Sequence, residues 1–434
     1  MLTCKTSPSN VSAGAISVPG DKSISHRAVI FACLGVGPSI IHNYLQSDDV
    51  TATVKAFKQM GVSIKNSNYN LLINGSGLRA LKKPLGPIDC GNSGTTCRLL
   101  TGLLSAQAFD SCLIGDHSLS KRPMERVIRP LTAMGASIKA KSGFLPLLIE
   151  GNKRLKGKSV DIMVPSAQVF TAIVLASFYS SDSTIIKHGG NFRNHTQKLM
   201  SYLGLPYKET QDCFIVYPLT SYTNKDIYVP SDFSSAAFFL LLGILSADDG
   251  LKISNVLINP SRTGLLNLLR KMGAIIEVQT SKESLYHEET ADITVYKSNL
   301  IGTTLDGELV QNAIDEVPVL AIAAAFASGQ TIIKNAQELR IKESDRISSM
   351  VNNLKLCGID CSELEDGMVI NGGIMNDASV DSYDDHRIAM SFIIAGLASD
   401  ATLQVKSCEI INTSFPGFFD VLTKLACNYI LIND

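Results

Sequence analysis

A short phrase that recurs six times along the chain is the feature that most constrains its fold. Each copy is an amphipathic helical stretch that ends in Met-Gly or a close variant and is followed by a short β-rich run. Glycine accepts the left-handed backbone conformation at a helix C-terminus. The repeat therefore predicts six supersecondary units of one kind. The copies end at Gly61, Gly135, Gly204, Gly273, Gly358 and Ala426, in steps of 74, 69, 69, 85 and 68 residues.

A long, almost fully apolar helix is expected before each of these phrases. A helix that is apolar on all sides should be buried, so only its polar first turn can reach a ligand. Short β-rich runs fill the gaps between the helices. Each unit should therefore read strand, buried helix, strand, amphipathic helix and strands. The six apolar stretches are residues 22–34, 94–104, 166–176, 234–245, 315–327 and 385–398.

Six such units can form one ring, a solenoid or two bundles of three. About 70 residues is long for a solenoid repeat, which favours two bundles. Three units around three buried helices would direct three helix N-termini the same way. We therefore expect an α/β protein with two domains, residues 20–225 and residues 1–19 plus 226–434, and a crossover in the polar stretch 219–230.

The composition excludes several classes of function. The chain has 434 residues, 45% of them apolar and 18% charged, and its net charge is −1. Bulk binding to nucleic acid or to an anionic membrane needs a basic surface, and the chain has no Trp for stacking on bases. Residues 1–14 are polar and show no signal peptide, and the apolar run 236–247 is too short to cross a bilayer. We expect a cytoplasmic globular protein.

The ten cysteines show no metal-binding or redox motif. Cys90 and Cys97 are seven residues apart, Cys357 and Cys361 are four apart, and neither pair has His residues nearby at metal spacing. We expect buried, reduced thiols that act as small apolar residues. The chain also lacks a Walker loop and a dinucleotide fingerprint. No metal and no cofactor are predicted.

The first buried helix begins with a cluster that can bind an anion. Asp21 can cap the helix after Pro19-Gly20, and the spacing of Lys22, Ser23, His26 and Arg27 predicts that they share one face. The unpaired N–H groups and the helix dipole add positive charge there, which suits phosphate or carboxylate. A solvated, charged helix start is the alternative when this stretch is taken by itself.

Other helix starts in the first half of the chain carry similar groups. The Gly-rich turn 89–98 can cradle an anion through its backbone N–H groups, and Gly94 permits close approach. The stretch Ser120-Lys-Arg-Pro123 is expected to open an amphipathic helix and to let Arg122 face an anion. Residues 166–168 open the third buried helix, and residues 193–195 the third amphipathic one.

The second half of the chain adds carboxylates to the cations. Asp315 should open the fifth buried helix, and Glu343 should lie just before a helix that begins near Ser344. These two acids are the candidate base and acid of a proton-transfer reaction. A solvated face of alternating charge is again the alternative. The neighbouring cations are Lys342, Arg346 and Arg387.

Several long motifs resemble those of the 5-enolpyruvylshikimate-3-phosphate synthase (3-phosphoshikimate 1-carboxyvinyltransferase) family. They occur in order over nearly the whole chain, and residues 166–168 and 315–320 resemble the class II bacterial branch. The resemblance implies the enolpyruvyl transferase fold, in which two similar domains each hold three βαβαββ units around buried parallel helices, as an inside-out α/β barrel. The motifs are Gly20–Arg27, Gly91–Arg98, Lys121–Met124, Ser166–Gln168, Leu339–Arg346 and Asp385–Arg387.

The resemblance implies transfer of the enolpyruvyl group of phosphoenolpyruvate to the 5-hydroxyl of shikimate 3-phosphate, with release of phosphate. Asp315 would take the hydroxyl proton, and Glu343 with Lys22 would handle the proton at the methylene carbon. The only partners implied are the two small-molecule substrates, and the protein would be a monomer. The implied shikimate 3-phosphate ligands are Lys22, Ser23, Arg27, Ser166, Gln168, Arg193, Asp315 and Lys342. Those for phosphoenolpyruvate are Lys22, Gly94, Arg122, Gln168, Arg346 and Arg387.

The chain departs from the family pattern at two positions. It has Ala167 where the family often has a second Ser, and Thr413 where many members have a lysine.

Two rival functions are considered. One rival is the sister enzyme that transfers enolpyruvate to UDP-N-acetylglucosamine. That enzyme usually carries Lys-Asn at the first helix and a reactive cysteine before the Arg-Pro helix, and this chain has neither. The other is a non-catalytic anion-binding repeat protein, which would not need Asp315 and Glu343.

Overall fold

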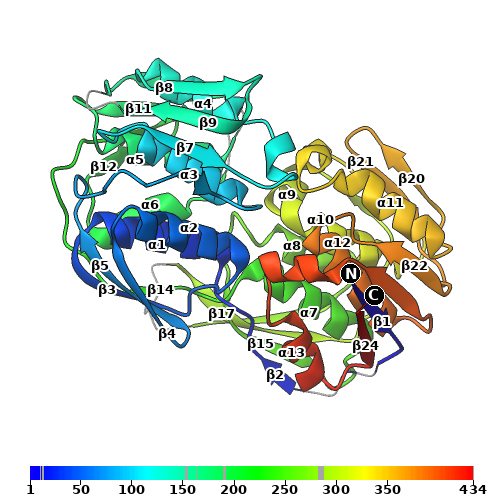
Figure 1. Cartoon of the computed structure of the whole chain (residues 1–434). Coiled ribbons are helices and arrows are strands. Elements are labelled where there is room, and N and C mark those ends of the chain that lie inside the picture. Colours follow the sequence, from blue (N-terminus) through cyan, green and yellow to red (C-terminus); the bar gives the residue numbers. More distant parts are fainter. Residues whose placement is uncertain are drawn as a thin grey trace. The chain divides into compact units, whose positions relative to one another are not determined.

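The computed structural model describes residues 1–434 except 10, 12–13, 152–154, 164, 189–191, 282–287 and 434. The described residues divide into two compact units. One unit is Gly20–Val229, and the other combines Met1–Pro19 with the described residues from Pro230 onward. Figure 1 shows the first of these in colours from blue to green. The predicted domain limits at residues 225 and 226 stay a prediction.

Among the described residues, the unit Gly20–Val229 contains three four-stranded sheets of one topology. In each sheet an edge strand runs parallel to its neighbour, and the other two strands follow antiparallel. In sheet order the strands are β14 (Ile227–Tyr228), β3 (Val36–His42), β5 (Asn70–Ser76) and β4 (Ser63–Ser67); β6 (Ile88–Asp89), β7 (Ser111–Ile114), β9 (Phe144–Glu150) and β8 (Ser137–Lys141); and β10 (Ser159–Ile162), β11 (Thr184–His188), β13 (Cys213–Val216) and β12 (Tyr207–Glu209).

The other unit repeats this topology three times over its described residues. The repetition confirms the six units of one kind that the recurring phrase predicts. In sheet order the strands are β2 (Gly14–Ile16), β15 (Leu251–Leu257), β17 (Thr290–Tyr296) and β16 (Ile275–Thr280); β18 (Thr304–Leu305), β19 (Gln330–Ile333), β21 (Gly367–Asn371) and β20 (Cys361–Leu364); and β22 (Ala378–Asp381), β23 (Leu403–Lys406), β1 (Leu2–Thr6) and β24 (Tyr429–Asn433).

The predicted apolar helices form and are buried almost throughout. One of them differs at its start, because Ile314–Glu316 form a 3-10 turn (η2) and the α-helix begins at Val317, with Pro318 in its first turn. Asp315 therefore lies in that turn rather than in the helix. The buried helices are α1 (Lys22–Leu34), α3 (Gly94–Leu104), α5 (Ala167–Ser177), α7 (Phe233–Ser246), α10 (Val317–Ala325) and α12 (His386–Ala398).

The amphipathic helices end as the repeated phrase predicts. Each recurring position takes the left-handed conformation, with φ of 91°, 98°, 72°, 97° and 81° at the five glycines and 54° at Ala426. The helices are α2 (Asp48–Gln59), α4 (Glu125–Ala133), α6 (His195–Leu203), α8 (Gly264–Lys271), α11 (Arg346–Leu356) and α13 (Phe418–Lys424). Shorter helical segments are α9 (Gly307–Asn312), η1 (Leu119–Lys121), η3 (Gln337–Ile341) and η4 (Cys408–Thr413).

The later unit combines two separate stretches of the chain. Strand β1 lies between β23 and β24, and β2 pairs in parallel with β15, so the N-terminal strands complete sheets of the later unit. Strand β14 comes just before α7 in the sequence but pairs with β3, which follows α1. Strands β1, β2 and β14 thus each complete a sheet with a partner strand that is distant in the sequence.

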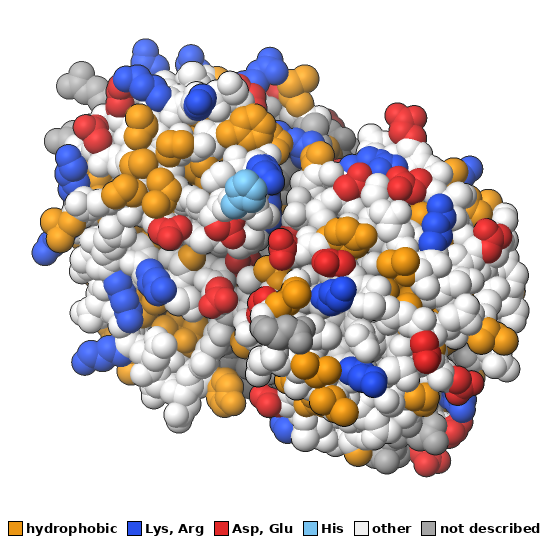
Figure 2. Space-filling view, turned by 45° about the vertical axis from the view of Figure 1, so that its right-hand side comes forward, with side chains coloured by type: hydrophobic (Ala, Val, Ile, Leu, Met, Phe, Trp, Pro, Cys, Tyr) orange, Lys and Arg blue, Asp and Glu red, His pale blue; other side chains and the backbone are white. Residues whose placement is uncertain are grey.

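None of the helices in the described part of the chain combines the length and the apolar character that a membrane crossing requires. Acidic and basic side chains both occur over the face seen in Figure 2, in keeping with a net charge of −1.

Candidate active site

The start of α1 is organised by local hydrogen bonds and by one ion pair. Asp21 caps the helix as predicted, because its Oδ1 accepts a hydrogen bond from the Ile24 N–H at 2.8 Å. The Lys22 ammonium lies 3.1 Å from the carboxylate of Asp49, in the first turn of α2. Lys22 and His26 share a face as predicted, since both contact α2, but His26 is fully buried, with its Nδ1 2.7 Å from Thr53 Oγ1. Packing of α2 against α1 turns that side inward.

Arg27 is only 2% exposed and connects α1 to two neighbouring helices. Its Nε donates to Thr196 Oγ1 at 2.8 Å, and its Nη2 donates to Thr171 Oγ1 at 2.8 Å and to the Ala167 carbonyl at 3.2 Å. Its Nη1 donates to the Ser23 carbonyl at 2.9 Å. The guanidinium therefore holds the start of α1 against α5 and α6. Its partners on α5 and α6 lie 140 or more residues away in the sequence, beyond the reach of any local pattern.

The Gly-rich turn meets the start of α5 through side-chain amide contacts. Ser93 caps α3, and Gln168 accepts from Arg98 Nη1 at 2.8 Å and donates to Thr95 Oγ1 at 3.0 Å. A Cβ at Gly94 would lie 2.8 Å from Arg98 Nη1 and 3.4 Å from an Nη1 of a second guanidinium, that of Arg122. Two arginines thus approach the backbone at Gly94, which suits a small anion. Ser166 caps α5 through the Val169 N–H, at 3.4 Å.

The prediction that residues 120–123 open a helix is wrong. Arg122 ends the 3-10 turn η1, and α4 begins only at Glu125. The chain is diverted because the Met124 N–H donates to the carbonyl of Gly143, in the β8–β9 turn, at 2.8 Å. Arg122 nevertheless lies beside the Gly-rich turn, since its Nη2 donates to Asn92 Oδ1 at 2.8 Å. Arg193 is half-buried and comes two residues before α6.

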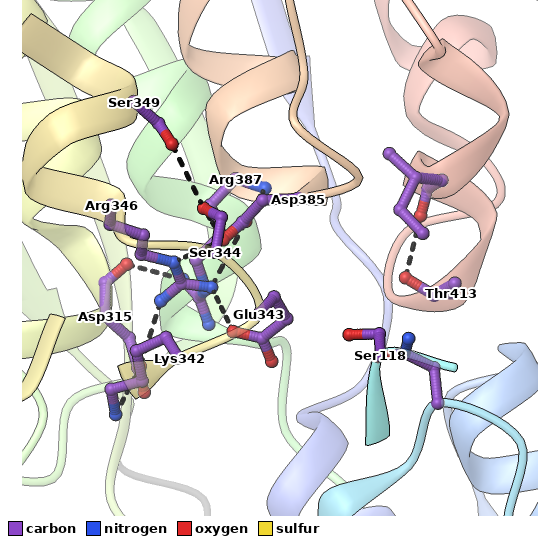
Figure 3. A network of polar contacts seen from close by, with 12 residues as sticks. Ser118, Asp315, Lys342, Glu343, Ser344, Arg346, Ser349, Asp385, Arg387 and Thr413 are labelled. Atoms are coloured by element: carbon purple, nitrogen blue, oxygen red, sulfur yellow. Dashed lines mark hydrogen bonds and ion pairs between the residues drawn. The ribbon is translucent and has the colours of Figure 1, made fainter. Parts of the chain in front are cut away.

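In the other unit, Asp315 lies between two cations. Its Oδ1 is 3.5 Å from Lys342 Nζ and 3.6 Å from Arg346 Nη1 (Figure 3). Glu343 lies on the same guanidinium, 2.7 Å from Arg346 Nη2. The helix start near Ser344 is confirmed, with Asp345 as the cap and Arg346 as the first residue of α11. The two candidate acids therefore share one arginine.

Asp385 is the third carboxylate that contacts the Arg346 guanidinium. It is fully buried and accepts from Arg346 Nε at 2.7 Å, from Arg346 Nη2 at 3.2 Å and from Ser344 Oγ at 3.2 Å. It also caps α12 through the Arg387 N–H, at 2.9 Å. Burial by itself would lower the pKa of the Arg346 guanidinium, but Asp385, Glu343 and Asp315 raise that pKa above its usual value. Arg346 therefore stays charged although it is buried.

Arg387 contacts the turn that holds Asp315. Its Nη1 donates to the Asp315 carbonyl at 2.9 Å and lies 3.7 Å from Glu316 Oε1. Glu316 is fully buried, accepts a hydrogen bond from Ser234 and lies 4.0 Å from Arg262 Nη2. Arg387 therefore holds the backbone of the 3-10 turn, and both arginines lie near the buried Glu316 carboxylate.

Comparisons with known proteins identify the family of the chain. The model of the family EPSP synthase (3-phosphoshikimate 1-carboxyvinyltransferase) matches residues 6–422. The chain belongs to the EPSP synthase family. It is 42% identical to the 3-phosphoshikimate 1-carboxyvinyltransferase of Ruthia magnifica subsp. Calyptogena magnifica, over 98% of each chain. It is 43% identical to that of Thermoanaerobacter sp. (strain X514), over 95% of this chain and 97% of the relative.

Solved structures confirm the predicted fold. An EPSP synthase from Acinetobacter baumannii superposes with a TM-score of 0.89 at 38% identity and 100% coverage of both chains. The enolpyruvyl transferase NikO from Streptomyces tendae has the same fold, with a TM-score of 0.78 at 15% identity, over 100% of this chain and 99% of that one. The enolpyruvyl transferase fold and EPSP synthase membership are therefore established, and the class II assignment stays a prediction.

In this chain, Thr413 lies where the family resemblance led us to expect a lysine. Its hydroxyl donates to the carbonyl of Ile410 within η4, at 2.7 Å, and Figure 3 shows it apart from the Asp315 cluster. The threonine thus completes its own turn and adds no positive charge there. Its contribution to ligand binding is an expectation drawn from the family pattern.

Several side chains that orient the site residues described above were not predicted from the sequence. Each is a polar group that contacts a side chain from a different segment of the chain. Two acids at helix starts, one of them in the quoted Asp-His-Arg motif, could have been found as the counter-ions that buried cations require. The others carry no local signal. The missed residues are Asp49, Asn92, Arg98, Thr171, Thr196, Arg262, Glu316 and Asp385.

Proposed function

We propose that the helix starts described above hold the two substrates of the EPSP synthase reaction. As a member of this family, the chain transfers the enolpyruvyl group of phosphoenolpyruvate to the 5-hydroxyl of shikimate 3-phosphate and releases phosphate. Both substrates are multiply charged anions. Fixed cations and helix N-termini can hold them and stabilise the charge that develops during transfer.

The observation that carries the proposal is the setting of the Asp315 carboxylate. Lys342 and Arg346 lie 3.5 and 3.6 Å from its Oδ1, longer than a strong charged hydrogen bond of about 2.7–2.9 Å. The carboxylate is thus oriented by two cations without being tightly bonded to either. Such a group can accept a proton from a substrate hydroxyl. We assign this role to Asp315 for the 5-hydroxyl of shikimate 3-phosphate.

The proton that reaches the methylene carbon is assigned to Glu343, acting with Lys22. The 5-hydroxyl oxygen bonds to C2 of phosphoenolpyruvate and gives its proton to Asp315, while C3 gains a proton from Glu343. In the second step the bond from C2 to the phosphate oxygen breaks, C3 returns a proton to Glu343, and Asp315 gives the hydroxyl proton to the departing phosphate. Atoms and charges balance without an oxidant or a metal. Arg346 touches both acids and can stabilise either ionised form.

The substrate contacts are proposed residue by residue from the family motifs. Their support is that most of these residues lie in or next to the first turns of α1, α3, α5, α11 and α12, or in the 3-10 turn before α10. For shikimate 3-phosphate they are Lys22, Ser23, Arg27, Ser166, Gln168, Arg193, Asp315 and Lys342. For phosphoenolpyruvate they are Lys22, Gly94, Arg122, Gln168, Arg346 and Arg387.

Phosphate release from phosphoenolpyruvate tests the proposal directly. The assay is run with shikimate 3-phosphate and, separately, with UDP-N-acetylglucosamine as the acceptor. Asp315→Asn keeps the size of the side chain and removes the base, so kcat should fall by about 10²–10⁴-fold. Asp400→Asn is the matched control, because Asp400 is an exposed aspartate of the same unit.

We expect release only with shikimate 3-phosphate, full activity in the Asp400 control and loss in the Asp315 variant. Release with the nucleotide sugar instead would move the assignment to the sister enzyme. Full activity of Asp315→Asn would remove the base role from this carboxylate and leave the reaction itself in place. Tight binding of both anions without release would favour the non-catalytic alternative.

We also propose that the enzyme works in the cytoplasm as a monomer whose partners are its two substrates. The balanced net charge of −1 and the ten free cysteines, most of them buried, support a small-molecule enzyme of a reducing compartment. Light scattering after size exclusion should then give a mass near 46.7 kDa. A mass near twice that value at micromolar concentration would contradict the monomer.

A further inference from the structure

A buried chain of polar side chains connects three helices of the unit Gly20–Val229. His26 Nδ1 lies 2.7 Å from Thr53 Oγ1, which lies 2.7 Å from Thr96 Oγ1, which in turn lies 2.8 Å from Ser93 Oγ. All four residues are fully buried. They belong to α1, α2 and α3, with Ser93 as the cap of α3. None of the roles proposed above uses this chain.

The donor and the acceptor of each hydrogen bond in this chain follow from counting the available protons. The Thr96 hydroxyl is placed to donate its proton to Ser93 Oγ or to the carbonyl of Asp49, 3.2 Å away, and a carbonyl can only accept. Thr96 has one hydroxyl proton, so it must accept the hydrogen bond from Thr53. Thr53 has then used its own proton and must accept from His26. His26 therefore carries its proton on Nδ1.

The other ring nitrogen leads to the same tautomer. His26 Nε2 is buried and has no hydrogen-bond partner among the residues that the structure describes. A proton there would be an unsatisfied buried donor, which is costly. Burial first, and then the charges of Lys22 and Arg27, lower the pKa of His26 well below its usual value, so the ring is neutral. Both nitrogens thus indicate one neutral form with Nδ1–H.

The two ends of the chain lie at two proposed substrate-binding helix starts. His26 is one residue before Arg27, and Ser93 is one residue before Gly94. The Asp49 carbonyl that accepts from Thr96 belongs to the residue whose carboxylate pairs with Lys22 at 3.1 Å. The hydrogen bonds along the chain are all 2.8 Å or shorter. A shift of α3 relative to α1 would therefore stretch several short buried bonds together.

We propose that His26, Thr53 and Thr96 form a chain of hydrogen bonds with one fixed donor-to-acceptor order. This chain holds the Gly94 turn in place relative to the start of α1. Its effect on phosphoenolpyruvate binding rests on the function proposed above for Gly94 and Lys22. The hydroxyl of Thr53 is the central link, because it accepts from one helix and donates to another. Loss of that hydroxyl should make the Gly94 turn less rigidly held, and Thr53 itself is not one of the proposed substrate contacts.

The matched pair Thr53→Ser and Thr53→Ala isolates the hydroxyl. Both variants lose the methyl group, and only serine keeps the oxygen that links His26 to Thr96. The alanine variant should raise the KM for phosphoenolpyruvate by about 3- to 10-fold, as expected for one lost buried hydrogen bond. The KM for shikimate 3-phosphate and kcat should change less than about twofold. The serine variant should restore the wild-type KM.

Nitrogen NMR of ring-labelled histidine reads the tautomer and does not depend on activity. The signal of His26 is identified by its loss in His26→Asn. The wild type and Thr53→Ser should show a protonated Nδ1 and an unprotonated Nε2, whereas Thr53→Ala should lose this single form. Should the alanine variant fail to fold by circular dichroism, Thr96→Ala with Thr96→Ser as its control removes the next link.

The outcomes separate the proposal from the function on which it rests. A wild-type His26 with its proton on Nε2 overturns the proton order. A correct tautomer with an unchanged phosphoenolpyruvate KM in Thr53→Ala overturns the positioning role. Failure of the wild type to release phosphate with shikimate 3-phosphate refutes the proposed function, and the NMR result still decides the proton order.

Discussion

Replacing Asp385 by asparagine tests the idea that a buried carboxylate keeps Arg346 charged and in place. Asp385 is fully buried, and Arg346 Nε and Nη2 donate to its two oxygens at 2.7 and 3.2 Å. The change keeps the shape and can keep the helix cap, because an asparagine oxygen also accepts from the Arg387 N–H. It removes the negative charge and turns an amide donor toward a guanidinium donor.

The expected loss follows from what Arg346 retains. Breaking a buried ion pair by removing one partner costs about 3–5 kcal/mol. Arg346 keeps Glu343 at 2.7 Å and Asp315 at 3.6 Å, so we expect the lower end, about 3 kcal/mol. Asp345→Asn is the matched control, since Asp345 caps α11 and pairs with Arg340 at 2.9 Å but has a side chain that is 37% exposed. That control should cost about 0.5 kcal/mol.

Amide hydrogen exchange followed by mass spectrometry measures both variants. The chain has two compact units, so the free energy of opening is read from peptides that cover α12 and α11 rather than from a single unfolding midpoint. The Asp385 variant should exchange faster in α12 by at least about 30-fold relative to the control in α11, which corresponds to about 2 kcal/mol. Equal losses in the two variants would refute the reasoning that burial makes this carboxylate different.

Three further predictions follow from backbone and side-chain geometry. Ala426→Gly should raise the unfolding free energy by about 0.5–1 kcal/mol in urea denaturation, because φ is +54° at this position. Gly135→Ala should lower the unfolding free energy by about 1 kcal/mol, because φ is +98° there although the space around it is open. An Ala426→Gly variant that is no more stable than the wild type would contradict backbone strain at Ala426. Burial lowers the pKa of His26 in the folded state, so the unfolded chain binds the extra proton, and stability is full above about pH 6.5 and falls as the pH drops. The wild type should therefore lose about 1.4 kcal/mol more per pH unit than His26→Asn between about pH 6 and pH 5, and parallel pH curves would count against a neutral buried ring. Gly94→Ala would bring a methyl group within 2.8 Å of Arg98 Nη1, so isothermal titration should show weaker binding of phosphoenolpyruvate by about 10-fold or more, and unchanged affinity would exclude close approach at this turn.

The candidate site could be predicted from sequence where the signal is local. The cap at Asp21 and the position of Lys342 and Glu343 just before α11 follow from short patterns of polar and apolar residues. The prediction for residues 120–123 failed because a hydrogen bond between Met124 and Gly143, 19 residues further on, decides where that helix begins. Asp315 lies in the 3-10 turn η2 rather than in the helix, which begins at Val317.

The partners of the buried charges could not be predicted in this way. Arg27 bonds to groups 140 to 169 residues away, and Arg346 bonds to Asp385, 39 residues away. A sequence pattern shows that such cations need counter-groups, because an unpaired buried charge is expensive, but it does not show which groups are near. His26 illustrates the same limit, since its spacing does not show that α2 covers it and leaves it fully buried.

The sequence by itself determined the sixfold repeat, the buried helices and the helix ends, because each depends on periodicity and on backbone preferences within a dozen residues. It also determined the family, since the motifs are long and occur in order. Only the tertiary structure decided the strand partners, with β1 between β23 and β24, β2 beside β15, and β14 beside β3 in a sheet of the earlier unit. Strand pairing and the choice of partner for each buried charge are non-local, so they depend on the packing of units that lie far apart in the chain.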